Sequence, residues 1–255
     1  MQLDFGAREV AVKLVYYGPA LSGKTTNLQA LHDRMGPEAR GRLMTLDTRD
    51  DRTLFFDLLP LTVRSRDGAG SLRVKLFTVP GQPIHAQTRK LVLQGADGVA
   101  FIADSQASET QQNAAAFLDL RDNLKEHGVD MPRLPLVIQF NKRDLPATRS
   151  HDELSELAQR GREPVYQAVA TRGEGVVETL IGLLDLTWRT LEATHGVSRA
   201  LGVNGDELLE SALRQLGDGR RVEEVLRARI GGDTTPRTGA VIEAPPPRDL
   251  PREPS

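Results

Sequence analysis

The sequence predicts an α/β fold with a mostly parallel sheet of six or slightly more strands, helices on both faces and one antiparallel hairpin at an edge. Strand-like and helix-like segments alternate up to about residue 194, which is typical of parallel strands with right-handed crossovers. Residues 59–66 and 71–79 are consecutive strand-like runs joined by a Gly-containing turn, which predicts the hairpin. Residues 10–17 form a β-rich run that leads into a Gly-rich loop and a helical pattern.

The first half of the chain follows this order. After the strand at residues 10–17, Leu28, Leu31 and Met35 give a helix an apolar face, and Gly36-Pro37 ends it. Residues 38–58 are polar, and we expect them to be irregular. The hairpin comes next, and a helical stretch then runs to about residue 94.

The second half continues the alternation. Residues 98–104 form a buried-type strand, and Ser108 with Gln111 predicts a capping box for the following helix. Two further strands and two helices are then expected, at residues 136–140, 150–160, 165–169 and 175–194. Each candidate motif described below follows a strand, as ligand loops do in this fold class.

The chain divides into three predicted parts. Residues 1–195 form the α/β domain, which carries the motifs described below. Residues 196–232 form a short amphipathic helical extension, with helices near 206–216 and 222–230 that we expect to pack back on the domain. Residues 233–255 are Pro-rich and lack apolar content, which predicts a disordered tail.

Composition excludes several classes of function. The chain has 255 residues, a net charge of −2 and no Cys, so disulfides, thiolate metal sites and Cys nucleophiles are excluded. No basic run stands out, and we expect no nucleic-acid partner. No long apolar segment or lipidation motif is present, so we expect a soluble, cytosolic protein without a transmembrane segment or lipid anchor.

Residues 18–25 match the phosphate-binding pattern G-x-x-x-x-G-K-[ST] between a strand and a helix. Gly18 and Gly23 let backbone N–H groups approach phosphate oxygens, and Lys24 supplies a positive charge to the β- and γ-phosphates. The Thr25 hydroxyl is a ligand for Mg²⁺. The sequence therefore predicts a nucleoside triphosphate site with Mg²⁺.

A second motif, Asn141-Lys142-Arg143-Asp144, favours guanine. The Asp144 carboxylate can accept hydrogen bonds from N1–H and the 2-amino group of guanine, whereas adenine would leave it unpaired. The Lys142 stem can cover the base, and Asn141 can join this loop to the phosphate loop. The expected ligands are GTP and GDP.

Several strings together resemble one family. GPALSGKTTNLQ, DRTLFFDLLPL, TVPGQ, RKLVLQGADGV and VIQFNKRDLP are similar to the bacterial Ras-like small GTPases of the mutual gliding protein A (MglA) family, over about residues 8–192. The resemblance implies that residues 1–195 are a small GTPase domain with a Ras-like P-loop fold. It implies GTP and Mg²⁺ as cofactors and a role as a polarity or motility switch in the bacterial cytoplasm. It also implies a roadblock/LC7-domain GTPase-activating partner and effectors that can recruit the protein to a cell pole.

The catalytic residues are expected around the γ-phosphate. Gln82 follows Pro80-Gly81 at a strand end, where a water-orienting Gln belongs. Thr53 is our candidate for a second metal-facing hydroxyl, and Arg52 resembles the family's arginine finger. The predicted catalytic residues are thus Lys24, Arg52 and Gln82, and the metal ligands Thr25 and Thr53. The residues expected to contact the nucleotide are Gly18, Pro19, Ala20, Leu21, Ser22, Gly23, Lys24, Thr25, Thr26, Gly81, Asn141, Lys142, Asp144 and Ala170.

Three positions depart from the usual GTPase pattern. Thr78 stands where most GTPases have the Asp of D-x-x-G, Pro83 follows Gln82, and the guanine-capping turn is Val169-Ala170-Thr171, whose Ala170 N–H can face the guanine O6. Thr78 and Pro83 leave open an alternative, a GTP-loaded scaffold with negligible hydrolysis. A P-loop kinase is disfavoured, because the guanine motif would then have no role.

Overall fold

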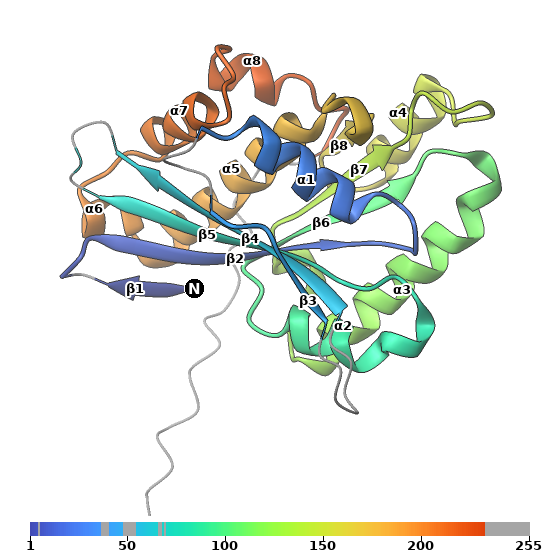
Figure 1. The fold of residues 1–255 in the computed structure, drawn as a ribbon, viewed down its shortest axis with the longest axis horizontal. Coiled ribbons are helices and arrows are strands. Elements are labelled where there is room, and N and C mark those ends of the chain that lie inside the picture. Colours follow the sequence, from blue (N-terminus) through green and yellow to red (C-terminus); the bar gives the residue numbers. More distant parts are fainter. Residues whose placement is uncertain (5, 37–40, 48–54, 66–67, 69, 233–255) are drawn as a thin grey trace, which may run out of the picture.

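The computed structural model describes residues 1–4, 6–36, 41–47, 55–65, 68 and 70–232. These residues form one sheet of eight strands (Figure 1). Seven of them lie in the order β3-β4-β5-β2-β6-β7-β8, and the eighth, β1, pairs antiparallel with the N-terminal end of β2. The strands are β1 (Gln2–Asp4), β2 (Glu9–Tyr17), β3 (Met44–Asp47), β4 (Phe55–Arg64), β5 (Ser71–Thr78), β6 (Gly98–Asp104), β7 (Leu136–Asn141) and β8 (Val165–Gln167).

The α-helices are α1 (Lys24–Arg34), α2 (Ala86–Leu93), α3 (Thr110–Glu126), α4 (His151–Arg160), α5 (Val176–His195), α6 (Val197–Leu201), α7 (Gly205–Gln215) and α8 (Val222–Leu226). Strands β5, β2, β6, β7 and β8 are parallel, whereas β4 pairs antiparallel with both β3 and β5. The predicted α/β class, with a mostly parallel sheet and an antiparallel hairpin toward one edge, is confirmed.

Alternate residues of β2 face two separate cores. Val12, Leu14 and Tyr16 pack with residues of α1, α5, α7 and α8 on one face of the sheet. Val15 and Tyr17 pack with α2, α3 and α4 on the other. The period of two along β2 therefore separates two helical layers, as expected for a strand buried on both faces.

The prediction that residues 38–58 are irregular is wrong in part. Met44–Asp47 is a strand, and β4 begins at Phe55, four residues before the predicted start. In this register Thr45 lies opposite Asp57, and the Thr45 hydroxyl donates to the Asp57 carboxylate at 2.8 Å. A cross-strand polar pair holds this segment in the sheet, and its polar character hid the strand.

The predicted capping box of Ser108 and Gln111 is also wrong. A 3₁₀ turn at Ala107–Glu109 precedes α3, whose N-cap is Glu109 without a side-chain hydrogen bond. A capping box is found instead at α4, where the Ser150 hydroxyl accepts from the Glu153 N–H at 3.2 Å. The Glu153 carboxylate accepts from the Ser150 N–H at 2.7 Å.

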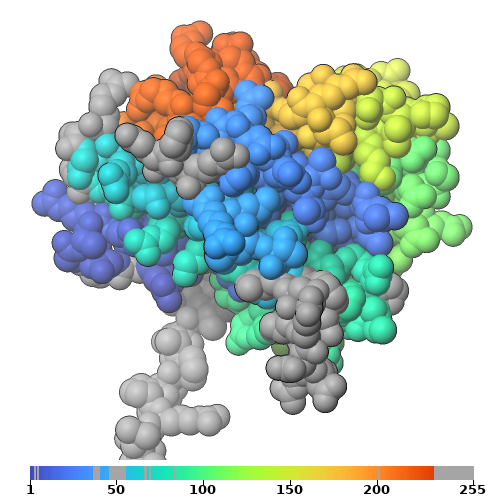
Figure 2. Space-filling model, in the orientation of Figure 1, coloured from blue at the N-terminus to red at the C-terminus, as the bar shows by residue number. Residues whose placement is uncertain are grey.

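The C-terminal helices pack on the α/β domain. Leu208, Leu209 and Leu213 of α7 and Val225 of α8 are buried in the same core as α5 and the sheet. The orange atoms of α7 and α8 form one continuous surface with the blue atoms of the N-terminal third in Figure 2. The Ser211 hydroxyl also donates to the Arg64 carbonyl at 2.7 Å. The second helix is shorter than predicted, because α8 ends at Leu226.

Candidate nucleotide site

The loop between β2 and α1 lies at the carboxyl end of the central strand. Because α1 begins at Lys24, the N–H groups of its first turn have no acceptors within the helix, and they carry the positive end of the helix dipole. A cavity of about 800 Å³ opens beside this turn. Its lining includes predicted site residues, namely Ala20, Leu21, Gly23, Lys24, Thr25, Thr26, Gly81 and Gln82.

Lys24 is a buried cation at this cavity. Its ammonium group donates to the Gly18 carbonyl at 3.0 Å and to the Pro19 carbonyl at 2.5 Å. Burial, followed by the positive charge of Arg89, lowers the pKa of Lys24 to about 8, although the Asp57 carboxylate acts in the opposite direction. A cation held among neutral carbonyls gains strongly from an approaching anion.

The loop residues fit a phosphate group in other respects. Ser22 Oγ is buried and has no hydrogen-bond partner among the described residues. Gly23 has a φ of 95°, and a Cβ there would lie 2.2 Å from Asn141 Nδ2, so only glycine fits without displacing Asn141. The loop amides, the Lys24 ammonium and the first turn of α1 supply hydrogen-bond donors and positive charge, which fit a phosphate group.

Asp57 organises the polar residues next to Thr25. The Thr25 hydroxyl donates to Asp57 Oδ2 at 2.6 Å, and the Thr78 hydroxyl donates to the same oxygen at 2.9 Å. The Asp57 backbone N–H in turn donates a hydrogen bond to Thr78 Oγ1 at 2.9 Å. With the bond from Thr45, one buried carboxylate accepts from three hydroxyl groups.

This oxygen-rich cluster fits Mg²⁺. Mg²⁺ is commonly held by one or two carboxylates together with substrate phosphates, and Asp57 brings a carboxylate to the predicted ligand Thr25. Among the described residues, no group of three or more His, Cys, Asp or Glu side chains could hold a metal by itself. The predicted ligand Thr53 and the predicted arginine finger, Arg52, lie outside the described residues.

Gln82 also lines the cavity, on the turn between β5 and α2. A Cβ on Gly81 would lie 2.2 Å from the Ala20 N, so this turn passes against the phosphate loop. The Gln82 backbone is extended, with φ −77° and ψ 141°, as expected before Pro83. Its carbonyl accepts from the Arg89 guanidinium at 2.6 Å.

At the predicted guanine end, Asn141 joins three segments. Its side-chain NH₂ donates to the Ser22 carbonyl at 2.9 Å, which is the predicted link to the phosphate loop. Its side-chain oxygen accepts from the Ala170 N–H at 2.9 Å. The Ala170 N–H therefore bonds to Asn141 in this structure, and its predicted contact with guanine O6 would require this hydrogen bond to be shared or exchanged.

The other residues of this end are held by ion pairs. The Lys142 ammonium lies 2.6 Å from Asp104 Oδ2, which fixes the stem predicted to cover the base. Asp144 Oδ2 lies 3.8 Å from a guanidinium nitrogen of Arg172, whose side chain is 61% exposed. None of Asn141, Lys142, Asp144 or Ala170 lines the phosphate cavity. The hydrogen bond from Asn141 to the Ser22 carbonyl joins the two halves of the predicted site.

The sequence interpretation missed three residues that shape the site: Asp57, Asp104 and Arg89. Asp104 could have been noticed, since it is the last residue of the strand β6 and lies, like each motif residue, at the carboxyl end of a parallel strand. Asp57 and Arg89 lie within the family strings DRTLFFDLLPL and RKLVLQGADGV, but the strings alone assign them no role. Their roles come from contacts between segments far apart in the chain.

In the part of the chain that the structure describes, no helix is long and apolar enough to cross a membrane. No protein-family model matches the chain. The chain is 44% identical over 190 residues to the mutual gliding-motility protein MglA of Myxococcus xanthus (strain DK1622). The match covers 74% of this chain and 97% of that protein, so this chain is the longer of the two. The extent of this identity, together with a Ras-like P-loop fold, shows that the chain belongs to the MglA family of small GTPases.

Proposed function

We propose that the protein is a GTP-binding switch that hydrolyses GTP to GDP and phosphate slowly alone and faster with an activating partner. The observation that carries the proposal is the position of Asn141, which bonds to Ser22 of the phosphate loop and to Ala170 beside the guanine motif. A single nucleotide could therefore span Lys24 and Asp144. A site that bound phosphate alone would have no use for this link.

Each residue has a role in the proposed reaction. Lys24 and the loop amides stabilise negative charge on the transferring phosphoryl group, and Gln82 orients the attacking water. Thr25 and Asp57 would hold Mg²⁺, which would neutralise phosphate charge. Arg52 adds a second cation near the developing charge, an effect worth about 10³ to 10⁵ in rate where such fingers operate. No residue forms a covalent bond.

The guanine end supplies specificity. Asp144 accepts from N1–H and the 2-amino group of guanine, and Lys142 covers the base while paired with Asp104. ATP would leave the Asp144 carboxylate unpaired, which costs a few kcal/mol. We therefore expect guanine nucleotides to be strongly preferred over adenine nucleotides.

A roadblock/LC7-domain protein is the proposed activator. The proposed pathway is cell polarity or gliding motility, and the name of the M. xanthus relative refers to gliding motility. Leu21 and Ile84 are large apolar side chains near the cavity and are 88% and 84% exposed. We propose that the activator and effectors bind at these two side chains, because binding there would remove their apolar surface from water. The protein is then cytoplasmic and is recruited to a pole by its partners.

The alternative is a GTP-loaded scaffold with negligible hydrolysis. Thr78 favours it, since a neutral hydroxyl stands where most GTPases have a carboxylate. Asp57 argues against it, because it brings a carboxylate to Thr78 and Thr25 from the neighbouring strand.

Single-turnover hydrolysis of GTP, with and without a roadblock-domain protein, separates the two functions. A switch loses γ-phosphate slowly alone and at least about tenfold faster with the activator. A scaffold keeps GTP in both cases, and a preference for ATP would overturn the guanine assignment.

A further inference from the structure

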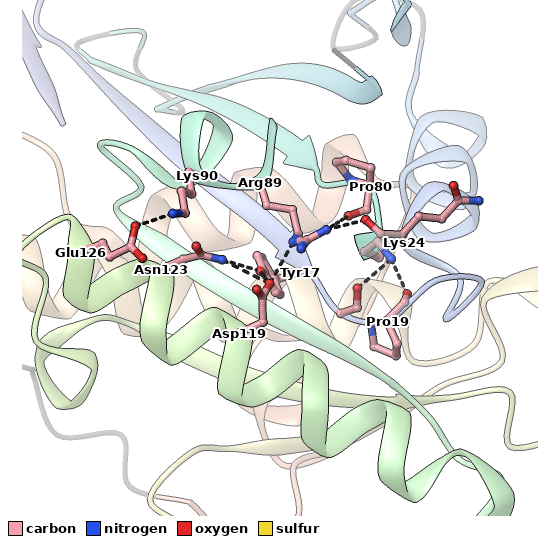
Figure 3. Close-up of polar contacts among 11 residues, drawn as sticks. Tyr17, Pro19, Lys24, Pro80, Arg89, Lys90, Asp119, Asn123 and Glu126 are labelled. Atoms are coloured by element: carbon pink, nitrogen blue, oxygen red, sulfur yellow. Dashed lines mark hydrogen bonds and ion pairs between the residues drawn. The ribbon is translucent and has the colours of Figure 1, made fainter. Parts of the chain in front are cut away.

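Arg89 connects the turn that carries Gln82 to the body of the protein. Arg89 lies on α2, and its side chain is only 8% exposed. Its terminal nitrogen donates to the Gln82 carbonyl at 2.6 Å and lies 3.5 Å from the Pro80 carbonyl. Figure 3 shows the guanidinium between Pro80 on one side and Asp119 with Tyr17 on the other.

The opposite side of Arg89 is fixed by a carboxylate on α3. Arg89 Nε donates to Asp119 Oδ2 at 2.8 Å. The Tyr17 hydroxyl donates to the same oxygen, and Asn123 Nδ2 lies 3.0 Å from the Tyr17 hydroxyl and 3.2 Å from Asp119 Oδ2. Tyr17 is the residue before Gly18, so this cluster joins the strand that leads into the phosphate loop to α2 and α3 (Figure 3).

The contacts of Arg89 are suited to orienting the turn that carries Gln82, beyond holding α2 and α3 together. Guanidinium hydrogen bonds to a carboxylate are charge-assisted and directional, and the planar group holds two partners in fixed geometry. Its bonds on the cavity side go to main-chain carbonyls of the turn, on both sides of Gly81. Because Arg89 bonds to the main chain of Gln82, it restricts the positions that the Gln82 side chain can reach. The side-chain amide of Gln82 stays free of this contact and can bond to water.

Arg89 is also electrostatically close to the phosphate site, because its charge helps to lower the pKa of Lys24. Neutralisation by Asp119 limits this repulsion. The pair thus brings a rigid cation to the back of the turn while Lys24 faces the proposed phosphates.

The geometry points to Arg89 as a positioning residue for GTP hydrolysis: held by Asp119 and Tyr17, it fixes the main chain of Gln82 so that the Gln82 side chain can orient water. This inference rests on the proposed function and deepens it. Arg89 itself touches no reacting atom in this assignment, and Asp119 acts through Arg89.

A neighbouring ion pair provides a matched control. Lys90 Nζ lies 2.6 Å from Glu126 Oε2, which also joins α2 to α3, but no contact of this pair reaches residues 80–82 among the described residues (Figure 3). If Arg89 only joined α2 to α3, the Arg89 and Lys90 variants would hydrolyse GTP at similar rates. If Arg89 positions the turn, only the Arg89 variants would be slow.

The test compares single-turnover GTP hydrolysis and GDP affinity in full-length wild type, Arg89→Gln, Arg89→Lys, Asp119→Asn and Lys90→Gln. We expect Arg89→Gln and Asp119→Asn to slow hydrolysis by about ten- to a hundredfold with GDP affinity within about threefold of wild type. Arg89→Lys should recover part of the rate because it keeps the charge. Lys90→Gln should stay within about twofold.

Hydrogen–deuterium exchange of residues 80–85 gives a second readout that does not depend on turnover. Exchange should rise in Arg89→Gln and remain as in wild type in Lys90→Gln. Wild-type hydrolysis in Arg89→Gln, or equal losses in the Arg89 and Lys90 variants, would overturn the inference. Absence of hydrolysis in the wild-type protein would instead contradict the proposed function, and the exchange data would then still decide whether Arg89 orders the turn.

Discussion

The Thr25 hydroxyl donates to the Asp57 carboxylate at 2.6 Å. This hydrogen bond joins the proposed metal ligand of the phosphate loop to strand β4, outside the phosphate-binding and guanine motifs. Asp57 lies on β4, opposite Thr78 on β5. A carboxylate thus stands beside the position where this chain has a threonine in place of the usual aspartate. In the proposed function, Asp57 supplies the negative charge that Thr78 lacks.

Replacing Asp57 by Asn should weaken binding of Mg²⁺ together with nucleotide. The amide keeps the size of the side chain but removes its charge, so GTP affinity in Mg²⁺ should fall by about ten- to a hundredfold. In EDTA the variant and wild type should bind GTP alike. Fluorescent-nucleotide titrations measure both conditions.

Thr45→Val is the control for Asp57→Asn, since Thr45 donates to the other carboxylate oxygen, Oδ1. It should change the Mg²⁺ dependence by less than about threefold. An equal loss for Asp57→Asn with and without Mg²⁺ would show that Asp57 only supports the fold.

Lys24 should make the stability of the nucleotide-free protein depend on pH. Its pKa is lowered from 10.5 to about 8 in the folded protein, so above pH 8 the unfolded chain binds more protons at Lys24 than the folded chain does. The cost of the buried charge is fully present below pH 8 and is relieved as pH rises toward 10.5. The Lys24 contribution to the free energy of unfolding should therefore rise by about 1.4 kcal/mol per pH unit in this window.

Urea unfolding of nucleotide-free wild type and Lys24→Met at several pH values isolates this contribution. The difference between the two proteins should change by about 2 kcal/mol between pH 8 and about pH 9.5. Lys13, whose pKa is also lowered by burial, is present in both proteins and cancels. A difference that does not vary with pH would mean that Lys24 is not buried as a charge.

Asp144→Asn should change the base that the protein prefers. The Asn amide can donate to the 2-oxo group of xanthine, whereas it meets the 2-amino group of guanine with a donor. GTP affinity should fall by about a hundredfold or more, and xanthosine triphosphate should become the better ligand in competition titrations. Arg172→Ala, which removes only the exposed partner of Asp144, should leave the preference for guanine unchanged.

The helices after residue 195 should be required for stability. Leu208, Leu209, Leu213 and Val225 are buried against the domain, and each such side chain contributes about 1.5–3 kcal/mol. A chain that ends at His195 should unfold at least about 10 °C lower than a chain that ends at Gly232, or aggregate. Differential scanning calorimetry of the two truncations decides this, and equal midpoints would show that α7 and α8 are dispensable for the domain.

The sequence predicted the features that depend on a few consecutive residues, and it missed most of those that depend on contacts between distant segments. The phosphate loop and the guanine motif were identifiable because their chemistry lies within a few consecutive residues. The link from Asn141 to Ser22 was also predictable, since both motifs follow parallel strands and so meet at one edge of the sheet. Asp57 was not, because its role depends on the pairing of β3, β4 and β5, and polar residues hid the first of these strands. Arg89 was missed for a similar reason, since its partners Gln82 and Asp119 come from separate segments, as does Tyr17, which donates to Asp119.

The most direct measurement of the central claim is the identity of the nucleotide bound to the full-length protein after incubation with excess GTP and Mg²⁺ and removal of free nucleotide. Chromatography of the released nucleotide should give mainly GDP for wild type and mainly GTP for Gln82→Leu, which cannot orient water. GTP in both proteins would favour the scaffold over the switch. Adenine nucleotide, or no nucleotide, in the wild-type protein would contradict the account.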